Sequence, residues 1–143
     1  MAKKKVFVSF DYDNDKNYKN LLKAWDANPN FDFYFSDLSS TEINSWSVPV
    51  VKQVLSTKIN EANYTVVLVG KEANKQHKDH KEIGYKNWIN YEVAKSKEHT
   101  NKLVAVKLDK SYDSPEQLLN SGASWAMSFT QEAIVKALND AAK

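Results

Sequence analysis

Short apolar runs alternate with polar stretches along this chain, and the spacing of the apolar residues changes from run to run. Continuous runs of β-branched and aromatic residues predict buried strands, whereas apolar residues three and four positions apart predict helices that cover a core. Strands are expected at 6–10, 31–35, 64–69, 103–108 and, for a short one, 124–129. Helices are expected at 18–25, from Pro49 onward, around Trp88, and from 131 to about 141.

The regular alternation of strand and helix predicts an α/β fold. Such folds have a mostly parallel central sheet with helices on both faces. The run Tyr64–Val69 is apolar throughout and ends at Gly70, which is typical of a strand at the centre of a parallel sheet. With 143 residues and no visible linker or internal repeat, we expect a single domain over residues 1–143.

Parallel sheets bind ligands at the carboxyl ends of their strands, where the strand order reverses. The connections after the first and second strands, and the loop and helix after the third, open onto that edge. The sequence therefore places six candidate residues near one another: Asp11, Tyr12, Asp37, Trp46, Trp88 and Glu92.

Trp88 and Glu92 are four residues apart, so they share a face if the segment is helical. An indole and a carboxylate side by side over one surface patch could bind and polarise a ring-bearing ligand. The alternative is an ordinary helix edge, with the indole half buried and the carboxylate solvated near Lys95 or Lys97. Both interpretations are open at this point.

Composition excludes several classes of function. The chain has no cysteine, which removes disulfides, thiolate nucleophiles and zinc–thiolate sites. All basic residues are lysine and the net charge is only +2, which argues against a nucleic-acid reader. Three glycines cannot build a dinucleotide fingerprint or a P-loop. The longest apolar run is too short for a membrane span and no secretory signal is visible, so we expect a cytoplasmic protein.

No metal site is expected. The acidic run Asp11–Asp15 resembles the start of an EF-hand loop, but Lys16 stands at the glycine position and Leu22 at that of the bidentate glutamate. A helix-capping loop is the better interpretation. His77 and His80 lie among lysines with no evident third ligand.

Two segments resemble motifs of a known family. Val6–Asp15 (VFVSFDYDND) resembles the first box of TIR domains, in which an apolar strand ending in serine and an aromatic residue runs into a polar loop. Trp88–Val93 (WINYEV) resembles the tryptophan-plus-glutamate helix of TIR domains that cleave NAD. The closest likeness is to the TIR-like proteins of bacterial Thoeris anti-phage systems, from Val6 to about Leu108. The Arg-Asp-x-x-Pro-Gly loop of animal TIR domains is missing, and residues 36–46 take its place.

The resemblance implies a single TIR-like, flavodoxin-like domain that acts on NAD as an NAD glycohydrolase or ADP-ribosyl cyclase. NAD would be the substrate, and no resident cofactor is implied. Glu92 would be the catalytic residue, beside an oxocarbenium-like transition state. The substrate-binding residues would be Phe10, Asp11 and Tyr12 along the nicotinamide and ribose, Trp88 against Glu92, and Asp37 and Trp46 at the rim.

The product would be a cyclic or modified ADP-ribose that diffuses to an effector protein. A phage protein could act as the trigger, and the chain could form homo-oligomers. A rival hypothesis is a TIR-like module that binds a protein or nucleotide without catalysis. A third is an enzyme that processes other nucleotides. These hypotheses share one fold and differ in whether NAD is turned over.

Overall fold

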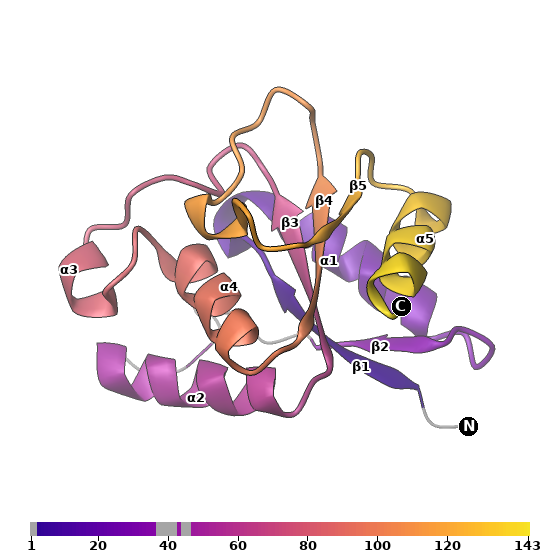
Figure 1. Ribbon diagram of the computed structural model, residues 1–143, viewed down its shortest axis with the longest axis horizontal. Helices are drawn as coiled ribbons and strands as arrows, with labels where there is room; N and C mark the ends of the chain where they lie inside the picture. The colour runs from indigo at the N-terminus through magenta and orange to yellow at the C-terminus, as the bar shows by residue number, and fades with distance from the viewer. Residues whose placement is uncertain (1–2, 37–42, 44–46) are drawn as a thin grey trace.

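The computed structural model of the protein describes residues 3–36, 43 and 47–143. Five strands form one parallel sheet with the order β2-β1-β3-β4-β5 (Figure 1). The strands are β1 (Lys4–Ser9), β2 (Phe33–Phe35), β3 (Tyr64–Val69), β4 (Lys102–Lys107) and β5 (Ser124–Ala126). The helices are α1 (Tyr12–Asp26), α2 (Val48–Asn60), α3 (His80–Ile83), α4 (Trp88–Glu98) and α5 (Gln131–Ala141), with a 3₁₀ turn η1 (Glu116–Leu118).

The strand order confirms the predicted α/β, flavodoxin-like fold. Every neighbouring pair of strands is parallel. The chain runs outward from β1 to β2, returns across β1 to β3, and then continues in the other direction. The order therefore reverses between β1 and β3, which is where such sheets leave a crevice for a ligand.

The two faces of the sheet pack against different helices, because successive side chains of a strand point to opposite sides. Val6 and Val8 lie in a core with α1 and α5. Phe7 lies on the other face, in a core with α2 and α4, and Val67 and Val69 pack there against α4 and η1. The helices thus form one layer on each side of the sheet (Figure 1).

Some predicted boundaries were wrong. α1 begins at Tyr12 rather than Tyr18, because Asp11 caps it by accepting a hydrogen bond from the backbone N–H of Asp13 and because the acidic residues of the first turn suit the positive end of a helix. Between β3 and α4, where the apolar spacing predicted no helix, the structure has α3, which is capped by Gly84 with a φ of 86°. β2 and β5 are three residues each, shorter than expected.

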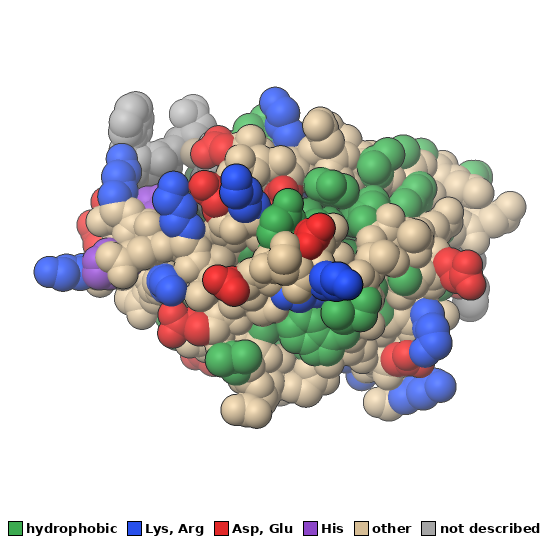
Figure 2. Space-filling model, turned by 90° about the horizontal axis from the view of Figure 1, so that it is seen from above, with side chains coloured by type: hydrophobic (Ala, Val, Ile, Leu, Met, Phe, Trp, Pro, Cys, Tyr) green, Lys and Arg blue, Asp and Glu red, His purple; other side chains and the backbone are tan. Residues whose placement is uncertain are grey.

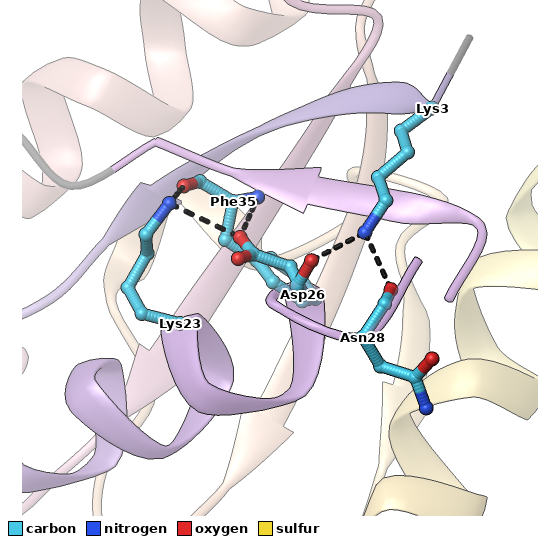
Figure 3. A network of polar contacts seen from close by, with 5 residues as sticks. All are labelled: Lys3, Lys23, Asp26, Asn28 and Phe35. Atoms are coloured by element: carbon cyan, nitrogen blue, oxygen red, sulfur yellow. Dashed lines mark hydrogen bonds and ion pairs between the residues drawn. The ribbon is translucent and has the colours of Figure 1, made fainter. Parts of the chain in front are cut away.

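The outer edge of β2 is closed by side chains of α1. Asp26 accepts a hydrogen bond from the backbone N–H of Phe35 (2.8 Å) and pairs with the Lys23 ammonium (3.1 Å), which also donates to the Phe35 carbonyl (2.8 Å). Lys3 donates to the carbonyls of Asp26 and Asn28 (Figure 3). The backbone N–H and the carbonyl of Phe35 are therefore both hydrogen-bonded, which blocks pairing with another strand at that position.

Candidate functional site

A cavity of about 320 Å³ lies at the reversal point between β1 and β3. Three segments build it: the residues after β1, those after β3, and the start of α4. Its lining consists of Phe10, Asp11, Tyr12, Asp13, Glu72, Lys75, Gln76, His77, Lys78, Asn87, Trp88 and Ile89. Figure 2 looks from above onto the upper ends of the strands in Figure 1, where hydrophobic side chains gather centrally and charged groups of both signs interleave around them.

The cavity brings together four of the residues predicted from the sequence. Phe10, Asp11, Tyr12 and Trp88 all line it. Phe10 also belongs to the core shared with α1 and α5, and its ring centroid is 6.3 Å from that of Tyr12. Trp88 packs edge-on against Tyr91, with 5.5 Å between the ring centroids. The lining therefore combines aromatic side chains with polar and charged groups.

Two further predicted residues, Asp37 and Trp46, lie outside the described residues. Their placement at the rim of the site stays a prediction.

Glu92 is buried rather than displayed on the surface. Its side chain is 2% exposed, and it does not belong to the cavity lining. The Ser9 hydroxyl donates a hydrogen bond of 2.6 Å to Glu92 Oε1. Ser9 immediately precedes Phe10 in the chain, and Trp88 lies one helical turn before Glu92, so residues of the cavity wall flank the carboxylate on both elements.

The expectation that Trp88 and Glu92 look out together over one surface patch was therefore wrong for Glu92. The helix is covered on several sides, because Tyr91 packs toward α2 while Ile89 and Val93 pack against the sheet. The face of the helix that carries Glu92 is turned toward Ser9 of β1. The alternative of a solvated carboxylate near the helix lysines is excluded by the same burial.

Burial sets the charge of Glu92. It raises the pKa of the carboxyl group from 4.5 to about 8, and the hydrogen bond from Ser9 acts in the opposite direction. The resting side chain is thus mostly protonated at neutral pH. A ligand that brings positive charge next to it would favour the ionised form, because opposite charges attract strongly in a desolvated site.

Polar side chains continue from Glu92 through the interface between α4 and the sheet. Ser96 donates to the Glu92 carbonyl (2.8 Å), and its hydroxyl lies 2.7 Å from that of Thr65 on β3. The Asn101 amide donates to Thr65 Oγ1 (3.3 Å). We call the residues Ser9, Thr65, Glu92, Ser96 and Asn101 the α4 seam. It fixes the rotation of α4 on the sheet, since each buried polar group needs its partner.

The sequence analysis missed an amide network that shapes the cavity. Asn87 caps α4 by accepting from the backbone N–H of Asn90 (2.8 Å), and its own amide donates to the carbonyls of Ala73 and Lys75 (2.9 Å each). Asn90 also accepts from the backbone N–H of Gln117 in η1 (2.9 Å). An asparagine just before a helical run is an N-cap signal and could have identified Asn87. Its two carbonyl partners depend on the tertiary fold.

Carboxylates gather on one side of the cavity. Asn14 joins two of them by donating to Asp11 (2.6 Å) and Glu72 (3.0 Å).

A further carboxyl group, that of Asp15, is buried close by. Asp15 is 5% exposed and lies against Gly70, where an added Cβ would be 1.9 Å from Asp15 Oδ2. Within the described part of the chain, that oxygen has no hydrogen-bond partner. Burial, followed by the charges of Asp11 and Glu72, raises the pKa of Asp15 to about 6.

Two kinds of feature are absent from residues 3–36, 43 and 47–143. They contain no cluster of three or more histidine, aspartate or glutamate side chains arranged to hold a metal ion. None of their helices has the length and apolar character required to cross a bilayer.

The strand order, the cavity at the β1–β3 reversal and the Trp–Glu helix define an α/β protein of the TIR-like class. Residues 7–113, more than half of the chain, match the family described as Thoeris protein ThsB, TIR-like domain. The chain therefore belongs to the Thoeris ThsB TIR-like domain family. Membership supports a role in Thoeris defence. A comparison with curated proteins finds no match.

Proposed function

We propose that this protein is an enzyme that cleaves NAD between nicotinamide and ribose and produces a cyclic or modified ADP-ribose signal in Thoeris defence. The observation that carries the proposal is the environment of Glu92: a buried carboxyl group, held by one hydroxyl, next to residues of an aromatic-walled cavity. A carboxyl group this costly to bury is a candidate for a functional site.

The chemistry requires only one carboxylate. Loss of nicotinamide generates an oxocarbenium-like transition state, which an adjacent carboxylate stabilises electrostatically. Nicotinamide leaves NAD as a neutral molecule, so no second carboxylic acid has to protonate it. The positive charge of the bound pyridinium ring would also help to ionise Glu92, whose burial otherwise favours the protonated form.

The remaining lining supplies binding groups. We assign the aromatic wall of Phe10, Tyr12 and Trp88 to the nicotinamide and ribose side, and Asp11 to ribose hydroxyls. Lys75 and Lys78, which line the same cavity, are the cations available for the diphosphate. Asp37 and Trp46 are assigned to the rim.

The product depends on which group captures the ribosyl cation. Water gives ADP-ribose, whereas an internal adenine or ribose group gives a cyclic isomer if the site excludes water. We place the reaction in the cytoplasm, with an effector protein as the receiver of the diffusible signal and a phage protein as the trigger. A second copy of the chain could take part in the active state.

The test is nicotinamide release from NAD by the purified protein and by a Glu92→Ala variant of matched fold, checked by circular dichroism. Both should also be assayed in cells under phage challenge, which supplies the trigger if one is needed. The proposal expects release by the parent protein and a loss of roughly a hundredfold or more in the variant. Equal release by both proteins refutes the assignment of Glu92.

The rival function is a TIR-like module that binds a protein or nucleotide without catalysis. The observation that favours it is that Glu92 does not reach the cavity lining in this structure. It predicts unchanged NAD in challenged cells that express either protein, together with nucleotide or protein binding that survives the Glu92→Ala change.

A further inference from the structure

We infer that Ser9 is a positioning residue for Glu92: it fixes the carboxylate in place and favours its ionised form. This inference rests on the proposed function, which it deepens by adding a residue that sequence reasoning did not select. Three observations carry it: the position of Ser9 on β1, the direction of its hydrogen bond, and the absence of a competing partner among the described residues.

The position follows from the fold. Ser9 is the last residue of β1 and pairs with Val67 of β3, so it stands at the crevice where the strand order reverses. Its side chain points to the face covered by α4, in the same direction as Phe7 two residues earlier. It is 0% exposed. A hydroxyl so deeply buried must have a partner, and that partner is Glu92.

The hydrogen bond has a defined direction. When Glu92 is ionised its oxygens can only accept, so the Ser9 hydroxyl must donate to Oε1 across 2.6 Å. Such charge-assisted bonds are about twice as strong as neutral ones. Ser9 therefore favours the form of Glu92 that the proposed reaction needs, in opposition to burial.

Within the part of the chain that the structure describes, no charged group competes for this role. The causes of the shifted pKa of Glu92 are burial and the Ser9 hydroxyl, with no charged neighbour among them. Of the acidic groups at the crevice, Asp11 and Glu72 act on Asp15, and Lys75, Lys78 and His77 lie on the cavity lining. On α4 itself, Tyr91 is engaged toward α2 through Ser56 and the Lys52 carbonyl.

The experiment measures the pKa of Glu92 directly and compares it with turnover. In protein labelled with ¹³C at glutamate, the Glu92 carboxyl signal is assigned with Glu92→Gln and titrated in the parent and in Ser9→Ala. We expect the pKa of Glu92 to rise in Ser9→Ala. Nicotinamide release should fall on the order of tenfold at pH 7, with most of the loss recovered near pH 9.5, since a tenfold change corresponds to one pH unit of titration.

A matched control is Thr65→Val. Thr65 is also 0% exposed and belongs to the α4 seam, but its hydroxyl lies against Ser96 and makes no bond to the Glu92 carboxyl group. This variant should lose stability without moving the pKa of Glu92 or the pH dependence of turnover. Ser9→Cys, which keeps the size of the side chain and has a weaker donor, should fall between the parent and Ser9→Ala, and it replaces Ser9→Ala if that variant fails to fold.

The results separate the two proposals. An unchanged pKa of Glu92 in Ser9→Ala, or in Ser9→Cys if that is the variant that folds, overturns the role of Ser9 even if the protein cleaves NAD. A raised pKa in a protein that never releases nicotinamide supports the role of Ser9 and counts against the proposed function. A loss of turnover that is equal at all pH values overturns the inference, because a merely structural role would produce it.

Discussion

Asp26 and Glu92 are both buried carboxyl groups, but their surroundings differ. Asp26, at the outer edge of the sheet, has an ammonium partner and accepts a backbone hydrogen bond. The carboxyl group of Glu92, on the face of α4 that packs toward β1, has one partner among the described residues, the neutral Ser9 hydroxyl. The first arrangement cancels the charge and fixes an edge strand. The second leaves most of the cost of burial uncompensated, which is the arrangement expected where a charge is to be used in chemistry.

The largest effects are expected when each of the two carboxylates is replaced by its amide. We expect Asp26→Asn to lower the free energy of unfolding by about 2 kcal/mol, since a partly buried pair and an edge hydrogen bond are weakened, and to leave turnover per folded molecule unchanged. Glu92→Gln should lower nicotinamide release by roughly a hundredfold or more. Urea unfolding and the release assay check the pair. A large loss of turnover in Asp26→Asn would show that the distinction is false.

The pH dependence of stability should distinguish the uncompensated carboxyl group. The pKa of Glu92 is about 8 in the folded protein against an ordinary value of 4.5, so the folded state holds the proton more tightly between these values. Its contribution to stability is fully present below about pH 4.5 and is lost as the pH rises through about 8, by at most ~1.4 kcal/mol per pH unit.

Glu92→Gln is the control for that window. The amide cannot ionise, so the stability of the variant relative to the parent should increase from pH 5 to pH 9 in urea unfolding. Asp15, whose pKa is raised to about 6, contributes a similar loss between about pH 3.8 and 6 in both proteins and cancels in the difference. Parallel curves for the two proteins would contradict the raised pKa of Glu92.

A third buried carboxyl group, that of Asp15, can be tested through its contact with Gly70. Gly70→Ala should destabilise the fold by about 1–3 kcal/mol, because the new methyl group would overlap the Asp15 carboxylate. In an Asp15→Ala background the same change should cost much less. Thermal unfolding of the four proteins of this double-mutant cycle gives the coupling. Equal costs in both backgrounds would mean that the close approach to Asp15 does not restrict position 70.

The smallest effect is expected from the charge next to Asp15. Asp11→Asn keeps a side chain that can cap α1 but removes a negative charge that raises the pKa of Asp15. The pKa of Asp15 should fall, with a change of only a few tenths of a kcal/mol in stability at pH 7. A carboxyl NMR titration measures it. An unchanged Asp15 titration would assign its shift to burial and to the charge of Glu72, without Asp11.

Much of the fold could be predicted from the chain, because the signals are local. The apolar run Tyr64–Val69 indicated a central strand, and it forms β3 with both faces covered. The apolar spacing after Pro49 predicted α2, and strand–helix alternation predicted the parallel sheet. Polar residues after β1 and at the start of α4 could be placed at one crevice, since the carboxyl ends of parallel strands share an edge.

The environment of the predicted catalytic residue could not be predicted in this way. Trp88 and Glu92 share a spacing, but the spacing says nothing about which helix face is covered by α2, by the sheet or by solvent. Burial of Glu92, its bond to Ser9 83 residues earlier in the chain, and the close approach of Asp15 to Gly70 are all long-range events. They depend on how the elements pack.

The elements, their order and the kinds of side chain at the carboxyl edge of the sheet follow from the amino-acid sequence, because hydrophobic periodicity and capping act over a few residues. Which carboxyl groups lose their water, and which partners they gain, depends on the packing of the whole fold. The packing therefore sets their pKa values, because the cost of a charge depends on all the groups around it and not on its neighbours in the chain.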